Sequence, residues 1–600
     1  MTKKVFALDT QPGVQRDGTV FDKQFYNDGR WVRFQRGRPR KILGYREISN
    51  VMAGPSRGLY VNPQNNFNYV FNGYSDGLQV IPINNTGIGA GVYNFSLSNF
   101  TPDVDNLWQF DTFFDTTGAG VESLVAHPGQ NLSDIANTVN TPVLIGNVAG
   151  TTMTAMTDGA APIEVSGGVV ILHPYVFVYG NNGLIKNCAA GDPTNWTSAD
   201  SNENNVAGNK IVMGLPVRGG SNSPSGLFWS LDSLIRVSYN PTTITTGTTA
   251  QTLYWRYDII SSQSSILSSQ SVIEYDGIYY WCGVDRFLLY NGVVKEIPNN
   301  MNQNYFFDNL NYSQRQKVYV TKVPRYGEIW WFYPRGDSVE CNDAIIYNVR
   351  EQTWYDAGTA LGARRSAGYF SQVFHFPVNM GTEINADGGA NLFTLIAGSG
   401  YTDDFYVNIP LTGGSGTGAI ANITVSGGAV TDVLITANGS GYEVNDVLTA
   451  SLPSGVGFQI TLTLLMSFFS LWQHEFGTDE IKGTNFNAIE SYFETSDLGL
   501  VSGGPSQPAA IGDNVWLHLE RVEPDFVQSG TMQLYITGRP YAQSDDQVSQ
   551  PYDFEPSTNK IDMREQRREL RIKIVSNVAG GNYQLGKLLL SANIGDVRGY

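Results

Sequence analysis

Charged residues are scarce in this 600-residue chain, because only 16% of its residues are Asp, Glu, Lys or Arg, against about 25% in an average protein. Uncharged polar residues must therefore cover much of the surface, which suits an extracellular or virion protein better than a cytosolic enzyme. Only three cysteines are present, Cys188, Cys282 and Cys341. Their wide spacing excludes a disulfide framework and the spacing of a zinc site, so we expect reduced thiols in β cores.

Long apolar runs are also missing. No stretch reaches the length of about 18 apolar residues that a membrane-spanning helix needs, and we expect no membrane span. The first residues, MTKKVFALDTQPG, contain no apolar run of signal-peptide length. The composition is nevertheless 41% hydrophobic and 12% aromatic, which is enough for large cores and excludes wholesale disorder.

Helix signals are few, and short alternating runs between Gly, Asn, Asp and Pro clusters predict an all-β fold. Asn-Gly and Asp-Gly pairs, as at Asn72-Gly73, Asp276-Gly277 and Asn291-Gly292, supply the positive φ angles of hairpin turns. The best helix candidate is Asn302–Gln316, where the aromatic residues are only weakly periodic. The clearest predicted strands are Phe67–Phe71, Val169–Leu172, Tyr175–Tyr179, Leu227–Leu231, Ile235–Tyr239, Thr252–Tyr257, Ile278–Cys282, Phe287–Tyr290, Lys317–Val323 and Glu328–Tyr333.

The hairpins between about 54 and 375 form a degenerate series that resembles the blades of a β-propeller; a pair of β-sandwiches with meanders is the alternative. The composition then changes to a Gly- and Thr-rich stretch. Within it, Gly398–Tyr401 (GSGY) recurs 41 positions later as Gly439–Tyr442. We expect four parts: a basic N-terminal segment that joins the C-terminal platform (1–53), a β-propeller (54–390), an inserted small β module (391–466) and a C-terminal antiparallel β-sandwich or platform (467–600).

Catalytic and cofactor motifs are not apparent. The five histidines have no metal-ligand spacing, and no Gly-x-Ser-x-Gly or Walker A motif occurs. Gly416-x-Gly418-x-x-Ala421 imitates a dinucleotide fingerprint, but a strand pattern follows it. Asp403, Asp404 and Asp446 are more simply explained as solvated turns than as a calcium site. We therefore expect no catalytic residue, no cofactor and no metal, with a carbohydrate-active propeller as the less favoured enzymatic alternative.

The net charge of −17 is unevenly distributed. Residues 1–57 contain 12 Lys/Arg and 5 Asp/Glu, a net of +7, and residues 560–600 contain 8 and 4, a net of +4. The remaining 58–559 carry 18 basic and 46 acidic groups, a net of −28. Tight binding to DNA needs cations on phosphates, so the acidic body is suited to letting DNA pass without binding it.

Arginines concentrate near both ends of the chain. They allow three interpretations: a solvated strand and turn, a docking face for an acidic neighbouring subunit, or nucleic-acid contact. The candidate docking residues are Arg30, Arg33, Arg36, Arg38 and Arg40 near the start, and Arg564, Arg567 and Arg568 near the end. The alternation in the first group prevents Arg30, Arg33 and Arg36 from sharing one face of a strand.

Several stretches resemble the tail hub or nozzle proteins of short-tailed bacteriophages, the packaged-DNA stabilisation family. The most specific is Asp28–Tyr45, DGRWVRFQRGRPRKILGY. The likeness covers about 1–390 and 467–600, whereas 391–466 departs from the shortest family members and resembles a module of phage structural proteins. The other stretches are Trp472–Gly477, Ala488–Thr495, Arg521–Phe526, Gly538–Tyr541 and Ile561–Arg568.

This resemblance implies a non-enzymatic virion protein in the phage tail. It implies a homo-hexamer below an adaptor ring, in contact with tail fibres or spikes, whose lumen retains double-stranded DNA and opens for ejection. Gly219–Gly226 and Ser261–Ser271 are candidate moving loops of such a gate, or simply static surface loops. The module 391–466 would hold fibres, extend the tip or decorate the surface, and deleting it should leave assembly intact if it is decoration. A receptor-binding or fibre-associated adhesin is the alternative.

Overall fold

The structure, a computed structural model, is almost entirely β, which confirms the predicted fold class. It describes residues 4–8, 10–19, 25–64, 67–84, 91–98, 107–114, 122–129, 140–217, 224–246, 249–372, 376–497, 515–540 and 544–597. Within these residues, helix is limited to α1 (Gln303–Asn309) and the 3₁₀ turns η2 (Asn181–Gly183), η3 (Tyr312–Lys317) and η4 (Leu361–Ala363). None of these helices is long and apolar enough to cross a membrane.

The central body contains six successive sheets whose strands pair mostly with their sequence neighbours. The first two sheets are β8 (Ser56–Gln64), β9 (Phe67–Tyr74), β10 (Gly77–Ile83) and β11 (Tyr93–Asn94); then β13 (Gln109–Phe114), β14 (Glu122–His127), β16 (Leu144–Asn147), β17 (Thr152–Ala155) and β12 (Ser96–Leu97). The next two are β21 (Gly168–Leu172), β22 (Tyr175–Tyr179), β23 (Leu184–Asn187) and β24 (Glu203–Asn205); then β25 (Ile211–Pro216), β26 (Ser225–Ser230), β27 (Leu234–Thr246) and β28 (Thr249–Ser261). The last two are β29 (Val272–Tyr275), β30 (Ile278–Cys282), β31 (Phe287–Tyr290) and β32 (Val294–Glu296); then β33 (Tyr319–Val323), β34 (Glu328–Tyr333), β35 (Asp343–Asn348) and β36 (Thr353–Asp356).

The first strands of these sheets are neighbours in space. In order, β8 contacts β13, β13 contacts β21, β21 contacts β25, and β29 contacts β33. The step from β25 to β29 is bridged by a buried cluster that includes Val212 and Val272. The cycle returns to β8 through β37 (Arg365–Ser371), which contacts both β33 and β8. This neighbour order favours the predicted propeller, which stays a prediction.

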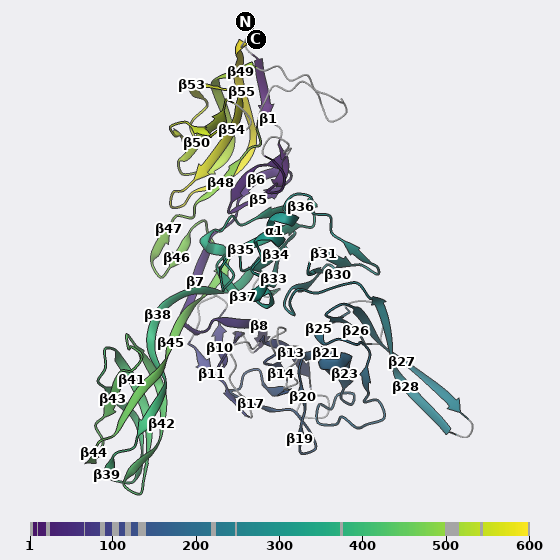
Figure 1. Cartoon of the computed structure of the whole chain (residues 1–600), viewed down its shortest axis with the longest axis vertical. Helices are drawn as coiled ribbons and strands as arrows, with labels where there is room; N and C mark the ends of the chain where they lie inside the picture. The colour runs from purple at the N-terminus through teal and green to yellow at the C-terminus, as the bar shows by residue number, and fades with distance from the viewer. Residues whose placement is uncertain are drawn as a thin grey trace.

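A platform unites the two ends of the chain (Figure 1). One sheet has the order β5 (Val32–Gln35), β6 (Arg38–Lys41), β55 (Asn582–Val597), β49 (Val515–Ser529) and β53 (Ile561–Arg567), with β1 (Lys4–Leu8) also on β55. The second sheet has the order β4 (Asp28–Arg30), β48 (Ser491–Glu494), β54 (Glu569–Ser576), β50 (Met532–Arg539) and β51 (Gln547–Val548), with β52 (Tyr552–Phe554) on β50. Alternation explains the shared core, because Ile572 and Ile574 of β54 and Leu588 of β55 are fully buried in one cluster.

Two long strands, β38 (Phe376–Ile396) and β45 (Gln459–His474), form an arm that leads away from the body (Figure 1). Both strands run through the expected boundaries at 390/391 and 466/467, so the module is the outer end of the arm. At the inner end, β45 pairs with β7 (Tyr45–Ala53), beside β46 (Glu480–Lys482) and β47 (Asn485–Asn487). The module adds β39 (Ser399–Tyr401), β40 (Asp404–Thr412), β41 (Thr417–Ser426), β42 (Ala429–Ser440), β43 (Val447–Ala450) and β44 (Ser454–Val456).

The repeated GSGY sequence produces a repeated structure. The turn glycines have φ angles of +65° at Gly398 and Gly439 and of +80° and +78° at Gly400 and Gly441, a region that glycine adopts without strain. Each tyrosine is buried, and its hydroxyl accepts a backbone N–H bond, from Phe458 at 2.9 Å for Tyr401 and from Ala419 at 3.3 Å for Tyr442.

The predicted strands of the body are confirmed, and Lys317–Val323 is shortened to β33 because Lys317 ends η3. The helix predicted over 302–316 is confirmed only for α1, since η3 is a separate 3₁₀ element. Buried Leu310 breaks the helix by adopting an extended conformation and pairing with Arg335. The Asn311 side chain then accepts the Ser313 N–H and starts η3. Four short pairs complete the fold: β2 (Gln11–Val14) with β3 (Phe25–Tyr26), β15 (Thr141–Pro142) with β20 (Glu164–Val165), β18 (Thr157–Asp158) with β19 (Ala161–Pro162), and β39 with β44.

Candidate functional site

Arg33 joins three parts of the molecule in a buried ionic joint. Its guanidinium donates to both carboxylate oxygens of Glu328 on β34, each at 2.9 Å, and to those of Glu475 beyond β45 at 2.8 and 2.6 Å. Arg33 itself lies on β5 and is 0% exposed. A side chain that is buried by its own chain cannot belong to a docking surface, so the expectation for Arg33 is corrected.

The surroundings of this joint compensate its buried charges. The Tyr355 hydroxyl and the Trp330 indole donate to Glu328 at 2.6 and 2.9 Å, and the Arg33 guanidinium lies 3.8 Å from the Tyr326 ring centroid. Burial is the largest effect on Glu328 and raises the pKa of its carboxyl, while Arg33 opposes that shift. The joint therefore fixes the platform, body and arm relative to one another at the cost of desolvating three charges.

The other N-terminal candidates lie nearer the surface. Arg30 forms a half-exposed ion pair with Glu490 at 2.8 Å. Arg36 is exposed in the turn between β5 and β6, where positive φ angles of +53° and +72° at Arg36 and Gly37 make a tight hairpin. Arg38 and Arg40 are partly exposed on β6.

Of the C-terminal candidates, Arg564 and Arg567 are on β53, at the other edge of the sheet that contains β5 and β6, and Arg568 lies between β53 and β54. Arg564 is exposed, whereas Arg567 pairs with Glu565 at 2.9 Å and Arg568 donates to the Pro540 carbonyl at 3.1 Å. Because β5 and β53 are opposite ends of the strand order, the structure does not bring the two arginine groups together. The two sets therefore do not form one docking face.

Two further arginines lie beside the N-terminal group, and sequence reasoning missed them. Arg325 and Arg350 are exposed in turns of the sixth sheet. Arg350 donates to the carbonyls of Arg325 and Pro324 at 3.0 and 2.8 Å. No local motif marks these residues, because each is a single arginine in a hairpin turn. We call Arg36, Arg40, Arg325 and Arg350 the Tyr326 patch, after the ring beside which Arg40 and Arg325 lie.

Asp343 and Asp356 are the carboxylate pair that most resembles an acid and a base. Burial, followed by repulsion from Asp356, raises the pKa of Asp343 to about 7. Arg16 holds Asp356 through two hydrogen bonds of 2.7 and 2.8 Å. Both carboxylates are nearly fully buried, however, at 0% and 1% exposure, and neither lines the hollow described below. The pair therefore gives a substrate no access in the described structure.

The histidines that the structure describes show no catalytic arrangement. Burial lowers the pKa of His127 to about 4, and its ring contacts the Val165 carbonyl and the Gly129 N–H. His474 accepts a hydrogen bond from Arg365 at 2.9 Å in the core of the joint. His375 lies outside the described residues.

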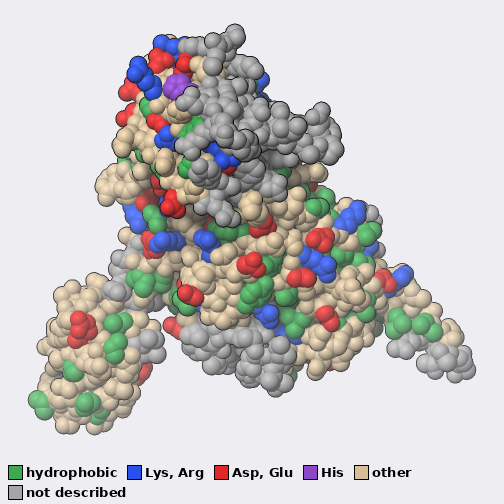
Figure 2. Space-filling model, turned by 45° about the horizontal axis from the view of Figure 1, so that its top comes forward, with side chains coloured by type: hydrophobic (Ala, Val, Ile, Leu, Met, Phe, Trp, Pro, Cys, Tyr) green, Lys and Arg blue, Asp and Glu red, His purple; other side chains and the backbone are tan. Residues whose placement is uncertain are grey.

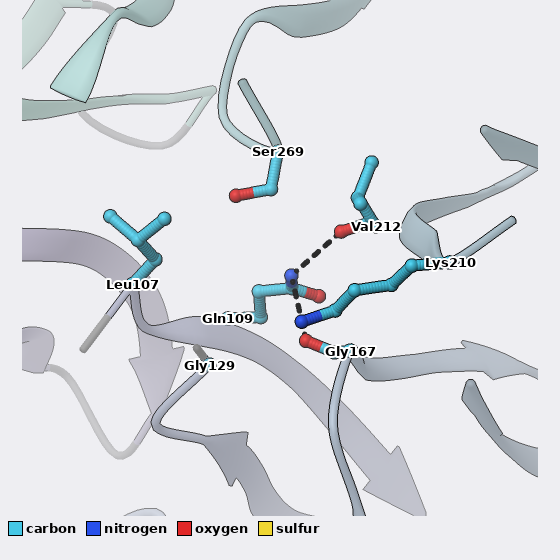
Figure 3. A pocket seen from close by; sticks show the side chains of 7 residues that line it. All are labelled: Leu107, Gln109, Gly129, Gly167, Lys210, Val212 and Ser269. Carbon is cyan, nitrogen blue, oxygen red and sulfur yellow. Dashed lines mark hydrogen bonds between the residues drawn. The ribbon is translucent and has the colours of Figure 1, made fainter. Parts of the chain in front are cut away.

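A polar hollow of about 190 Å³, part of it open solvent, lies where the second to fifth sheets of the body meet (Figure 3). Gln109 crosses it and donates to the carbonyls of Gly167 and Val212 at 3.4 and 3.0 Å. The Lys210 side chain ends beside Gln109, and the Ser269 hydroxyl points toward the hollow. Ser269 Oγ has no partner in the described structure. Because the strands around it are held together by the Gln109 bonds, the hollow is a small polar gap between sheets.

Two acidic residues of the module, Asp403 and Asp446, act as turn caps. Asp403 accepts the N–H groups of Gly427 and Gly428 at 2.9 and 2.7 Å. Asp446 accepts from the Ser415 amide and hydroxyl and from the Glu443 amide. No group of three or more metal-ligating side chains occurs in the described part of the chain. The three cysteines are free and buried, as predicted.

The candidate gate loops are only partly placed. Residues 219–223 of Gly219–Gly226 lie outside the described residues. In the second segment, Ser264 and Ser268 are fully buried and Ser269 is 3% exposed. Ser268 also donates to the Gln316 carbonyl at 2.8 Å. This half of Ser261–Ser271 is packed between sheets, which disfavours it as a moving loop.

No protein-family model matches the chain, and no curated protein matches it. Matching solved structures include an exported protein of Bacteroides fragilis, with 12% identity, a TM-score of 0.26, and coverage of 56% of this chain and 83% of the other. An exo-β-1,3-galactanase of Phanerochaete chrysosporium has 9% identity, a TM-score of 0.25, and coverage of 92% and 99%. The AfRom2 CNH domain has 10% identity, a TM-score of 0.21, and coverage of 59% and 91%. At these TM-scores the matches assign neither a fold nor a function.

Proposed function

We propose that the chain is a structural subunit of a short-tailed phage tail, a nozzle or hub that forms a six-fold ring beneath the adaptor ring. The observation that carries the proposal is the layout. A platform uniting both chain ends sits on a six-sheet body, from which the arm and the β27–β28 ribbon project on different sides (Figure 1). The sequence resemblance at 28–45 and in the C-terminal stretches supports the same assignment.

The β27–β28 ribbon indicates a protein that functions among neighbours. Its partner strand β26 pairs only with residues 234–238, and the Tyr239 N–H donates to the Pro224 carbonyl at 2.9 Å, so 242–246 pair with β28 alone. A two-stranded ribbon is marginally stable in water, and Ile244 and Leu253 on one face of it are 48% and 40% exposed. Packing against another subunit would cover these side chains.

The charge distribution suits a channel. The net of −28 over 58–559 repels DNA, so six such subunits could surround the genome without holding it. Accessible catalytic chemistry is not apparent in the described residues, since the one carboxyl pair with a strongly shifted pKa is buried. A neutral or basic lumen in the assembled ring would overturn this part of the proposal.

Electron microscopy of the purified chain and of virions tests the proposal. We expect a six-fold ring at the distal end of the tail, with the platform facing the adaptor or the tip. A trimer, a monomer, or a position in the capsid would contradict it.

A virion adhesin is the second candidate, favoured by the module. Eight of its large apolar side chains are exposed at the far end of the arm: Leu395, Ile396, Phe405, Val407, Leu434, Val444, Val447 and Val456. Binding of the purified full-length chain to host cells, lost when the module is deleted, would favour this role over that of a nozzle.

A further inference from the structure

The Tyr326 patch is an exposed cluster of cations without carboxylate partners. Arg36, Arg40, Arg325 and Arg350 form no ion pair within the described structure. The nearby Glu351 does not neutralise them through an ion pair, because its two oxygens accept the backbone N–H groups of Arg36 and Gly37 at 2.8 and 3.1 Å. Arg40 also donates to the Gln35 side chain and Arg350 to two backbone carbonyls, so the patch offers the remaining N–H groups of these two residues, together with Arg36 and Arg325, to an external anion.

The centre of the patch is prepared for such a contact. The Arg40 and Arg325 guanidinium groups lie 5.7 and 5.4 Å from the Tyr326 ring centroid, and Arg33 beneath is already committed to Glu328 and Glu475. The Tyr326 side chain is 5% exposed, and its hydroxyl has no hydrogen-bond partner in the described structure. The planar guanidinium fork of arginine binds carboxylate and phosphate groups through two parallel hydrogen bonds.

The same chain carries a complementary surface. No Lys or Arg occurs between 366 and 481, so the arm and module carry carboxylates only. Asp404, Asp432 and Glu443 are exposed there without an ion pair in the described structure. Figure 2 shows carboxylates and apolar side chains on the module and no basic side chain on the visible face.

Strand register places part of this acidic surface beside apolar groups. Phe405 pairs with Thr424, and Thr424 pairs with Asp432 across β40, β41 and β42. Since Ile423 on the other face of β41 is buried, these three residues share the outer face, and Leu434 follows two positions after Asp432. Phe405 and Leu434 are 57% and 61% exposed. This outer face combines carboxylate and apolar groups, the composition of a protein interface.

We propose that the Tyr326 patch of one subunit binds the exposed carboxylates of the module of a neighbouring copy. The two surfaces cannot meet within one chain, because the module lies at the outer end of the arm and the patch lies beside the platform hairpin (Figure 1). DNA is the less suited anion, since residues 58–559 carry a net charge of −28, which repels it. The inference depends on the proposed ring in one respect only, because the contact requires more than one copy of the chain.

A charge-swap experiment on the full-length chain tests this contact. The first variant carries Arg36→Glu, Arg325→Glu and Arg350→Glu, and the second carries Asp404→Lys, Asp432→Lys and Glu443→Lys. We expect each to weaken self-association by roughly tenfold or more, as like charges face each other, and the chain with all six changes to recover it. Analytical ultracentrifugation and mass photometry between 50 and 500 mM NaCl measure association, which should weaken with salt in the wild type.

Arg236→Glu, Lys295→Glu and Lys587→Glu together provide the control, because all three side chains are exposed outside the patch and the charge change is the same. Melting temperatures equal to the wild type exclude unfolding as the cause. Unchanged association in either triple variant, or absence of recovery in the combined one, overturns the proposal. Loss of binding to duplex DNA in the first variant, with association unchanged, identifies nucleic acid as the partner instead. A six-fold ring at the tail end in virions supports the nozzle even if the swap fails.

Discussion

At the scale of single residues, the fold depends on buried charges whose ion-pair partners are distant in the sequence. Arg33 is separated from Glu328 by 295 positions and from Glu475 by 442. Its spacing to Arg30 and Arg36 correctly predicts that the three do not share a face, but no local pattern reveals its partners. The ionic joint could therefore not be predicted. Of the Tyr326 patch beside it, Arg36 and Arg40 were candidates from the sequence, whereas Arg325 and Arg350 were missed.

Arg33→Met should destabilise the chain by about 3–5 kcal/mol, because it leaves Glu328 and Glu475 buried without their cation. Urea denaturation followed by tryptophan fluorescence measures this change. Arg30→Met is the matched control: its pair with Glu490 is half-exposed, so the loss should stay below about 1 kcal/mol. Equal effects of the two variants would contradict a dominant role for the joint.

Lys41 should make the platform more stable as pH rises. The side chain is 1% exposed and donates to the Gly581 carbonyl at 2.9 Å, and burial lowers its pKa from 10.5 to about 8. Between pH 8 and pH 10.5, Lys41 keeps its proton in the unfolded chain and has lost it in the folded chain. The free energy of unfolding therefore increases with pH across this interval.

Lys41→Met should therefore raise stability at pH 7 by about 1–3 kcal/mol and flatten the rise between pH 8 and 10. Chemical denaturation at pH 7, 8, 9 and 10 compares the variant with the wild type. An identical pH slope in both proteins would show that Lys41 does not cause it.

At the scale of elements, the sequence was informative wherever alternation and turn chemistry were local. The strands around Asp276-Gly277 and Asn291-Gly292 were predicted correctly because each turn lies directly between its two strands. The helix over 302–316 was predicted too long, because the pairing of Leu310 with Arg335 is a tertiary contact. The N-terminal strands pair with β55 and β48, and this pairing is set by the whole fold. The expectation that the segment 1–53 joins the platform needed only the resemblance.

The module depends on tyrosines packed against glycines. Gly416 lies under the Tyr442 ring, and a Cβ at this position would stand 2.5 Å from the Tyr442 nitrogen and 2.6 Å from the Ser440 carbonyl oxygen. Gly416→Ala should therefore destabilise the module by about 1–3 kcal/mol. Hydrogen exchange should show faster exchange in β41 and β42 and little change in the platform.

Gly208→Ala provides the control for this substitution, since a Cβ there meets no atom within 4 Å. Exchange in the module should be unaffected by it. Faster exchange throughout the chain in the Gly416 variant would contradict a local role for the tyrosine contact.

At the scale of the whole molecule, the mean charge conceals three different surfaces. The acidic body, the cation-free arm and the Tyr326 patch lie in different places, although composition reports only a net of −17. Splitting the charge along the chain predicted basic ends, but the structure shows that Arg33 and Arg567 are already paired within the chain. The surface available to a neighbour is thus smaller than the sequence suggests, and it includes Arg325 and Arg350 from the acidic body.

The full-length chain should not bind duplex DNA at 150 mM salt, despite its exposed arginines. Counterion release needs many cations along the phosphates, whereas the patch has four guanidinium groups and residues 58–559 carry a net charge of −28. Fluorescence anisotropy with a labelled 30-base-pair duplex should show no saturation up to roughly 10 μM protein, weaker than the typical range for specific binding. Lowering the salt to 20 mM should reveal at most weak binding that is lost in the Arg36, Arg325 and Arg350 triple variant. Binding below 1 μM at 150 mM salt would contradict the proposal that DNA passes this protein without being held.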